Sequence, residues 1–260
     1  MKLCYILPKY DPRDATHFAH IHDLLKAVAP SMTLWLVVEK GSVPPPELGY
    51  ARATLLRLPA SFRLFEHLVR LAWIRARGYR IFYIHYSFAG ACAASVVARL
   101  SGACVFYWNC GEPWKFTRSF LRERFERLTY KMIHHLVTGA PRLAEGYARI
   151  YGIRRDSIRV MPNWIDLARF APKGRAPQTR EKMGVPPAGK LVLFTHRLSA
   201  RKGADLLLPI MEKLLEEVPN AYLAIAGIGP EATALTDRIQ GNPLLAERVR
   251  LLGSVPNADI

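Results

Sequence analysis

The sequence has no apolar run long enough to cross a lipid bilayer. A spanning helix needs about 20 consecutive apolar residues, and no window of this chain approaches that length without charges. The apolar run Leu3 to Leu7 gives way to Lys9 and Asp11, so it is too short for the hydrophobic core of a secretory signal peptide. These absences predict a cytoplasmic protein.

Cysteine is also scarce, and its spacing is not that of a metal-binding or redox pair. The four cysteines are Cys4, Cys92, Cys104 and Cys110, and no two stand in a C-x-x-C motif. Three of them lie on or beside apolar runs, as buried free thiols usually do. The sequence therefore predicts neither a disulfide nor a metal site.

Glycine is missing from the loop after the first expected strand. The stretch PKYDPRDAT, residues 8–16, contains none, whereas dinucleotide-binding folds carry G-x-G-x-x-G at this place and an acid about 20 residues later. This absence argues against a dinucleotide-dependent oxidoreductase.

Acidic residues are outnumbered by basic ones, and the net charge is +16. Residues 1–172 hold 25 lysines and arginines against 12 acids, whereas residues 173–260 hold 12 against 9. A field of this kind attracts phosphates, nucleic acids or anionic lipids. Because no nucleic-acid recognition motif accompanies the charge, we expect no specific nucleic-acid partner.

Apolar runs alternate with amphipathic stretches along almost the whole chain. Near-continuous apolar strands separated by helices are typical of a parallel sheet covered on both faces. Residues 1–165 therefore predict an α/β domain with a doubly wound parallel sheet, whose ligands bind beyond the carboxyl ends of the strands. The expected strands are 2–7, 33–38, 53–58, 80–85, 103–108 and 133–138, and the expected helices are 16–28, 61–77, 89–100, 116–132 and 141–151.

A stretch rich in proline and charge, residues 160–180, interrupts this pattern, which then restarts. We expect a linker at 166–188 and the first half of a second Rossmann-like domain at 189–260. An α/β domain of this kind commonly needs about 100 to 150 residues, so we expect this one to be incomplete. Its expected strands are 190–195, 221–226 and 248–252, and its expected helices are 205–217 and 231–240.

The first loop of this second domain concentrates positive charge. Residues 194–208 are FTHRLSARKGADLLL, with Arg197 and Lys202 five positions apart. A helix beginning near Ala204 would point its unpaired N–H groups and positive dipole end at the loop, an arrangement that binds anions. Arg197 offers a forked donor and Lys202 a mobile charge, both suited to phosphate oxygens. From the residues alone, an anion site and a pair of solvated cations are both open interpretations.

With this loop, three further stretches resemble family 4 of the glycosyltransferases, which have the two-domain GT-B fold. They are AGIGPE at 226–231, RVRLLGSVPNADI at 248–260 and IRVMPNWIDLARFAP at 158–172. The family patterns are G-R-L-x-x-x-K-G, V-G-x-G-P, R-V-x-F-L-G and I-P-N-G-V-D-x-x-x-F, and their order and spacing match residues 156–260. The first domain is similar to the family's acceptor domain in LPKYDPRDATHFAHIHDLL and in IFYIHYSFAGACAASVVARLSGACVFYWNCGE.

The resemblance implies a retaining transfer of a sugar from a nucleotide-diphosphate sugar to a glycan or a lipid-linked acceptor, without metal or cofactor. Arg197 and Lys202 match the residues that hold the donor diphosphate and offset the charge of the leaving group. Gly227 and Gly229 match the turn that shapes the wall of the donor domain, and Asn163 matches the interdomain hinge.

On the acceptor side, the resemblance implies that His17, Asn109 and Glu112 face the cleft as catalytic residues. The residues themselves leave other roles open. Asn109 and Glu112 flank a glycine and are equally suited to forming a turn. His85 ends an expected strand, where a ligand-facing role and a structural role are both open.

The chain departs from the family pattern at several positions. His196 stands in place of the first glycine of the cationic motif, Trp164 replaces the hinge glycine, and Asn109 stands where many members have histidine. Asp14 to Thr16 replace a glycine pair. The E-x7-E segment that contacts sugar and ribose in the family lies downstream of the matched region, so we expect these 260 residues alone to be an inactive fragment.

Two basic amphipathic stretches suggest a membrane partner. Residues 61–80 hold five arginines against one acid, and residues 115–131 hold six basic residues against two acids. We expect their apolar faces to pack against the sheet. Their charge favours either simple solvation or attraction to the anionic inner face of a membrane. A non-catalytic basic α/β protein that binds such a membrane or another polyanion is the alternative function.

Overall fold

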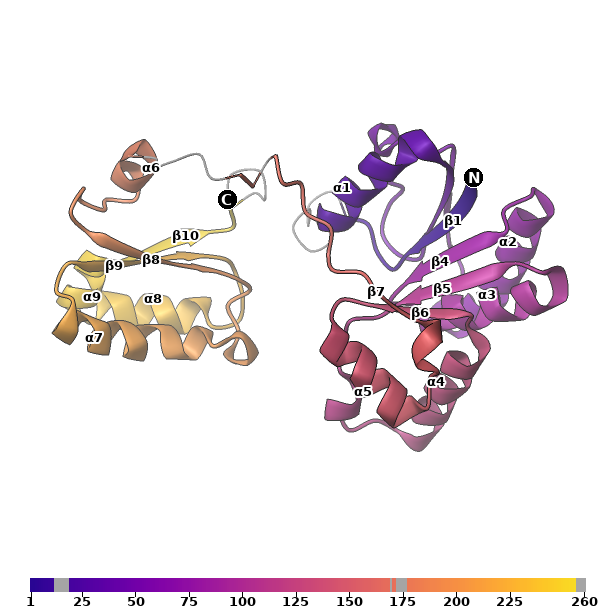
Figure 1. Ribbon diagram of the computed structural model, residues 1–260. Helices are drawn as coiled ribbons and strands as arrows, with labels where there is room; N and C mark the ends of the chain where they lie inside the picture. The colour runs from indigo at the N-terminus through magenta and orange to yellow at the C-terminus, as the bar shows by residue number, and fades with distance from the viewer. Residues whose placement is uncertain (12–18, 169, 172–176, 256–260) are drawn as a thin grey trace. The chain divides into compact units, whose positions relative to one another are not determined.

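The computed structural model describes residues 1–11, 19–168, 170–171 and 177–255 (Figure 1). The chain divides into two units, Met1–Arg169 and Phe170–Ile260, and the division falls inside the stretch 166–188. Among the described residues, no helix combines the length and the apolar character that crossing a bilayer requires.

The first unit is built on a seven-stranded parallel sheet with the strand order β3-β2-β1-β4-β5-β6-β7. This confirms the predicted doubly wound α/β fold. Its strands are β1 (Lys2–Leu7), β2 (Thr33–Val38), β3 (Arg52–Leu55), β4 (Ile81–His85), β5 (Cys104–Trp108), β6 (His135–Thr138) and β7 (Ile158–Val160). Its helices are α1 (Ala19–Val28), α2 (Arg63–Ala76), α3 (Phe88–Ser101), α4 (Phe120–Met132) and α5 (Pro141–Tyr151).

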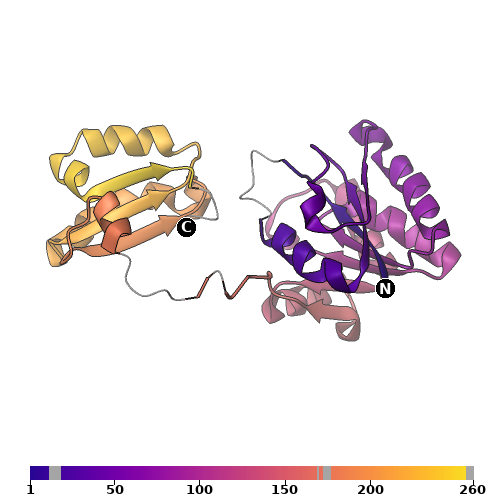
Figure 2. The same cartoon turned by 90° about the horizontal axis from the view of Figure 1, so that it is seen from above.

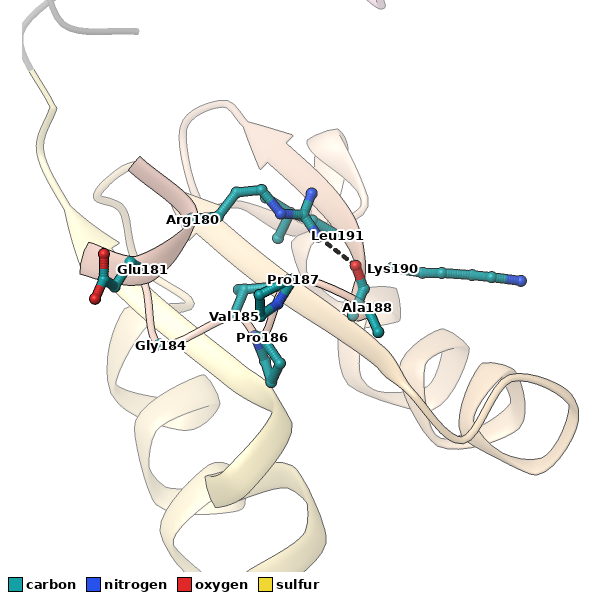
Figure 3. A pocket seen from close by; sticks show the side chains of 10 residues that line it. Arg180, Glu181, Gly184, Val185, Pro186, Pro187, Ala188, Lys190 and Leu191 are labelled. Carbon is teal, nitrogen blue, oxygen red and sulfur yellow. Dashed lines mark hydrogen bonds between the residues drawn. The ribbon is translucent and has the colours of Figure 1, made fainter. Parts of the chain in front are cut away.

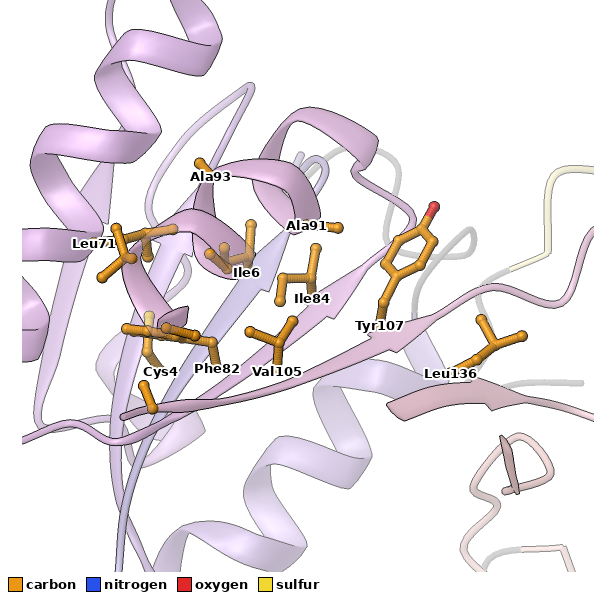
Figure 4. Packing of buried hydrophobic residues seen from close by; sticks show 14 of the residues in the cluster. Cys4, Ile6, Leu71, Phe82, Ile84, Ala91, Ala93, Val105, Tyr107 and Leu136 are labelled. Atoms are coloured by element: carbon orange, nitrogen blue, oxygen red, sulfur yellow. The ribbon is translucent and has the colours of Figure 1, made fainter. Parts of the chain in front are cut away.

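Each face of this sheet has its own apolar core. On one face, Ile6, Phe82 and Val105 from neighbouring strands pack with residues of α2 and α3 such as Leu71 and Ala91 (Figure 4). On the other face, strand residues pack against α1. Alternate side chains of a strand point to opposite faces, so near-continuous apolar strands are needed to fill both cores.

The strand order reverses between β1 and β4, because helix α1 leaves β1 toward one face of the sheet and α3 leaves β4 toward the other. In open α/β sheets, ligands bind in the crevice that this divergence leaves beyond the carboxyl ends of the strands. In this unit the crevice lies beyond Leu7 and His85.

The seventh strand was not expected, because Ile158–Val160 fell at the start of the proline-rich stretch. It is three residues long and only Ile158 is buried, so it has no apolar run of its own. It is held in the sheet by its pairing with β6, in which Ile158 lies opposite Leu136. A short edge strand of this kind is recognisable only from its neighbour.

The second unit has a three-stranded parallel sheet in the order β10-β9-β8, whose strands lie side by side in Figure 2. Helices α7, α8 and α9 cover one face of it (Figure 1). Its elements are α6 (Pro177–Lys182), β8 (Lys190–Thr195), α7 (Leu207–Glu217), β9 (Ala221–Ala226), α8 (Ala232–Gln240), α9 (Pro243–Arg248) and β10 (Val249–Gly253). The six-residue helices α6 and α9 were not expected, because each is too short to show a helical period.

Candidate functional site

The cationic loop of the second unit is held in place by backbone hydrogen bonds to the neighbouring turn. His196 N donates to Ala226 O at 3.2 Å, and Leu198 N donates to Ile228 O at 3.0 Å. Glu231 N in turn donates to Leu198 O at 3.1 Å. The side chain of Leu198 is buried in the core. The loop after β8 is therefore braced against the turn that follows β9.

Gly227 and Gly229 are what allow the two loops to lie so close. A Cβ atom at Gly227 would fall 1.9 Å from His196 O, and one at Gly229 would fall 2.1 Å from Leu198 O. Gly227 also has φ of 155°, which side chains disfavour. The sequence predicted these glycines as part of the donor-domain wall. In the structure, their lack of a side chain lets the backbone of the turn contact the backbone of the cationic loop.

Arg197 and Lys202 are both exposed on this loop, at the carboxyl end of β8. Burial first, and then the charges of Lys202 and Arg201, lower the pKa of His196, whose Nδ1 accepts a hydrogen bond from Arg197 N at 2.7 Å. The imidazole is therefore neutral near pH 7 in a positive local field. Such a field favours the binding of an anion.

Helix α7 begins later than expected, at Leu207 instead of near Ala204. Two 3₁₀ turns, Ala200–Lys202 and Ala204–Leu206, come first, and Gly203 joins them with φ of 75°. Tight 3₁₀ turns are common where a helix begins. The side chains of Arg197 and Lys202 supply the charge at this loop directly, whereas the first turn of α7 lies further along the chain.

A hollow of about 910 Å³ lies at the opposite end of β8 (Figure 3). It is lined by residues 184–191 and by Arg180 and Glu181 of α6, and the guanidinium of Arg180 donates to the backbone oxygen of Gly189. It lies at the amino end of the strand, away from Arg197. Because open α/β sheets bind their ligands at the carboxyl ends of the strands, we do not assign this hollow as the ligand-binding site despite its size.

In the first unit, His85 is the last residue of β4 and is buried at the carboxyl edge where the crevice between β1 and β4 opens. Its ring stacks on Trp108 with centroids 4.1 Å apart, and its Nδ1 is 3.2 Å from Tyr5 Oη. Asn163 and Trp164 line a small cavity of about 10 Å³ together with His85 and Trp108. Asn163, predicted as a hinge residue, therefore lies against the crevice of the first unit.

We predict that His85 makes the first unit sensitive to acid. Burial, assisted by His20, lowers the pKa of His85 to about 3. Between pH 6.5 and 3 the unfolded chain binds a proton that the folded protein excludes, so stability falls as the pH falls, by at most about 1.4 kcal/mol per pH unit. The variant His85→Phe keeps a ring against Trp108 and should show a shallower loss in urea unfolding between pH 6 and 4. An unchanged pH slope would contradict this assignment.

Tyr86 is a residue of this crevice that the sequence did not reveal. It has φ of 60°, a left-handed backbone conformation that residues other than glycine seldom adopt and that is frequent at binding sites. Its ring meets Trp108 edge to face, it is 38% exposed, and its Oη is 2.6 Å from Cys110 Sγ. Burial and this hydrogen bond raise the pKa of Tyr86, so the hydroxyl is neutral. The sequence pattern around Tyr86 does not predict a left-handed backbone conformation at this residue.

Asn109 is buried, and its side chain is engaged inside the first unit. Its Oδ1 accepts from Gly111 N at 2.9 Å, and its Nδ2 donates to Tyr107 and Tyr130, both at 3.3 Å. Tyr147 in turn donates to Gly111 O at 3.0 Å. These contacts are those of a turn-forming residue, which was the alternative to a catalytic role.

Glu112 is half-buried and pairs with Lys115 at 2.7 Å between Oε2 and Nζ. Its catalytic role stays a prediction. His17, the third catalytic residue that the sequence suggested, lies outside the described residues. Within the described ranges, no three His, Cys, Asp or Glu side chains are grouped as a metal ligand set.

Comparison with family models identifies both units. The model for Glycosyltransferase Family 4 matches residues 19–169, more than half of the chain, and the model for Glycosyl transferases group 1 matches residues 176–260. The chain belongs to glycosyltransferase family 4. The predicted membership is thus confirmed, and the braced cationic loop lies in the part of the chain that matches the second model.

Curated relatives carry glycosyltransferase names. The D-inositol 3-phosphate glycosyltransferase of Xylanimonas cellulosilytica is 33% identical over 140 residues, which is 48% of this chain and 33% of that protein. A phosphatidylinositol N-acetylglucosaminyltransferase component of Arabidopsis thaliana is 28% identical over 109 residues, 42% of this chain and 22% of that protein. The matches thus span a third or less of these relatives' length.

Solved structures share the fold at low identity. The Anabaena protein HepE in complex with UDP has a TM-score of 0.76 and 15% identity over 98% of this chain and 70% of that one. A glycosyltransferase of Rickettsia africae has a TM-score of 0.76 and 14% identity over 98% of this chain and 69% of that one. These neighbours confirm the GT-B-like fold.

Proposed function

We propose that this chain comprises the acceptor domain and part of the donor domain of a retaining glycosyltransferase. The observation that supports this most directly is the cationic loop after β8. Its backbone is hydrogen-bonded to the turn that contains Gly227 and Gly229, and the chain belongs to family 4. A nucleotide-diphosphate sugar is the proposed donor, consistent with the UDP in the Anabaena structure.

In this proposal, Arg197 and Lys202 bind the diphosphate of the donor. Breaking the glycosidic bond leaves additional negative charge on the nucleoside diphosphate, and two fixed cations stabilise that charge as it develops. Because the backbone of the loop is already held by His196 and Leu198, little reorganisation is needed on binding. We propose that no metal takes part.

The acceptor is proposed to bind at the carboxyl edge of the first sheet. Tyr86 presents a neutral, partly exposed hydroxyl there, beside the stacked rings of His85 and Trp108. His85 and Trp108 are themselves buried, so the exposed ring of Tyr86 is the aromatic surface offered to a sugar or a polyol. The names of two relatives indicate inositol-containing acceptors, one of them a phosphatidylinositol. We propose a glycan or lipid-linked acceptor of the cell envelope, used by a peripheral enzyme on the cytoplasmic side of the membrane.

The donor site can be tested by UDP binding to the 260-residue chain. Arg197→Ala and Lys202→Ala each remove a charge-assisted contact to phosphate, so each should weaken UDP binding roughly 10- to 100-fold in calorimetry. Arg238→Ala is the matched control, because Arg238 is an exposed cation of the same unit that pairs with Glu212 at 3.5 Å. It should leave the affinity unchanged.

The pH dependence gives this experiment a second readout. A bound diphosphate would favour protonated His196 and raise its depressed pKa, so UDP should bind more tightly as the pH falls from 7 to 6. If the Arg197 and Lys202 variants bind UDP as well as the Arg238 variant does, the diphosphate is not bound at this loop.

A further inference from the structure

We propose that the outward face of α2 is a docking surface for an anionic lipid bilayer. Four large apolar side chains lie exposed along this helix and the turn before it: Phe62 at 60%, Phe65 at 61%, Val69 at 52% and Trp73 at 41%. Their spacing of three, four and four residues places them in one line on the helix surface. We call these four residues the α2 stripe.

The stripe is not the face that holds α2 to the protein. Leu71 and Ile74 lie fully buried in the core of the first unit, and His67 is also fully buried. The expectation that the apolar face of this segment packs on the sheet is therefore right for these inward residues and wrong for the α2 stripe. A helix that is apolar on both faces needs a second apolar environment.

The exposed charged side chains of α2 and of its C-terminal cap, Arg77, are all positive. The only acid of the helix, Glu66, is buried, and its two oxygens accept from Arg57 N at 2.7 Å and Leu58 N at 3.0 Å. Arg70 and Arg77, in contrast, are exposed, and the Arg77 guanidinium lies 3.3 Å from the centroid of the Trp73 ring. The outward face of this fully described helix thus combines apolar side chains with cations and no carboxylate.

This combination favours an anionic membrane over the other partners that an apolar stripe could meet. A second copy of the chain would bring a second set of arginines to the same interface, where like charges repel. An uncharged apolar partner would offer no negative group to the guanidinium charges of Arg70 and Arg77. Anionic headgroups bind arginine, and phenylalanine and tryptophan enter the interfacial region below them.

Contacts with the rest of the first unit hold α2 in a fixed position, so the four side chains of the α2 stripe are presented together. Trp73 packs edge to face on the buried Trp35, with centroids 5.0 Å apart. Arg63 and Arg75 fasten the two ends of the helix through Glu39 O at 2.5 Å and Ser101 O at 2.6 Å. Because these contacts already order the helix, binding to the bilayer loses little conformational entropy.

The start of α4, on the same face of the sheet and on the other side of α3, also exposes apolar side chains and an arginine, although the carboxylate of Glu123 lies there too, paired with Arg127. Phe120 is 69% and Leu121 is 78% exposed, and the Arg124 guanidinium lies 5.4 Å from the Phe120 ring centroid. Two helices of this face thus present aromatic and cationic side chains outward. The inference deepens the proposed peripheral function and rests on it, because α2 starts beside Glu39 at the carboxyl edge where we place the acceptor.

Vesicle sedimentation of the full chain tests the proposal without a transfer assay. Wild-type protein should pellet with vesicles of equal phosphatidylglycerol and phosphatidylcholine, and not with phosphatidylcholine alone. The double variant Phe65→Ser, Trp73→Ser should bind at least about tenfold more weakly, because two large apolar side chains no longer enter the bilayer. The matched control is Ile210→Ser, which removes an apolar side chain that is 60% exposed on α7; it should bind as wild type does.

The arginines are tested separately by Arg70→Glu, Arg77→Glu, which should abolish sedimentation at physiological salt. Equal binding of all variants, or no binding of wild type to anionic vesicles, would overturn the proposal. So would a dimer in analytical ultracentrifugation that the stripe variant dissociates, since a second copy would then cover the stripe. UDP binding by the same proteins reports on the donor site independently, so failure of the membrane surface and failure of the glycosyltransferase function are distinguishable.

Discussion

Gly229→Ala is expected to unfold the second unit while the first unit stays folded. The added Cβ would lie 2.1 Å from Leu198 O and 2.8 Å from Leu198 N, and both are backbone atoms of the braced loop. No side-chain rotation relieves such a clash, so the loop or the turn after β9 must move. Loss of this packing should destabilise the unit by roughly 4 kcal/mol or more, the upper end of single-residue effects.

The distribution of tryptophan makes the two units separable in this experiment. The five tryptophans are Trp35, Trp73, Trp108, Trp114 and Trp164, and all belong to the first unit. Tryptophan-detected urea unfolding of Gly229→Ala should therefore match wild type, whereas the far-ultraviolet circular dichroism should lose the contribution of the second unit.

Gly241→Ala serves as the control for glycine replacement in the same unit. Gly241 follows α8 with an ordinary φ of −75°, and its Cβ would meet Asp237 O at 3.3 Å, a contact that small shifts relieve. Its effect should stay within about 1 kcal/mol. A Gly229→Ala protein with wild-type circular dichroism would show that the loop can leave the turn, and the supporting role of this glycine would then be wrong.

Glu126→Gln is expected to destabilise the first unit by about 3–5 kcal/mol. Glu126 is almost fully buried in α4 and forms an ion pair with Arg118, whose side chain is 11% exposed. Arg118 also donates from Nη2 to Tyr151 Oη at 2.8 Å. Without the carboxylate, the guanidinium stays buried beside a neutral amide, and a buried charge without its partner is strongly unfavourable.

The matched control for this pair is Arg122→Ala. Arg122 contacts the same carboxylate at 3.1 Å, but its side chain is 66% exposed, so solvent screens the interaction. Its loss should change the unfolding free energy by about 1 kcal/mol or less, as read from tryptophan-detected urea curves. A similar effect of both variants would indicate that the network, and not the burial of Arg118, sets the stability.

The alternation of apolar runs and amphipathic stretches determined the fold class of this chain. Strands such as β1 are apolar on both faces, and that pattern is typical of a parallel sheet covered by helices on both sides. The cationic loop was likewise found in advance, since Arg197 and Lys202 follow a strand whose carboxyl end is the ligand side of any such sheet. These features depend on local order along the chain, which the sequence displays directly.

Only the tertiary structure decided which side chains are buried, which are exposed, and which residues each one contacts. Asn109 is directed inward by two tyrosine hydroxyls, and Tyr86 takes a left-handed backbone beside Trp108. Phe65 and Phe82 are chemically alike, yet one is exposed on α2 and the other is buried between strand and helix. Composition and period show that a segment is apolar, but exposure depends on which distant segments pack against it, and that is settled only when the chain has folded.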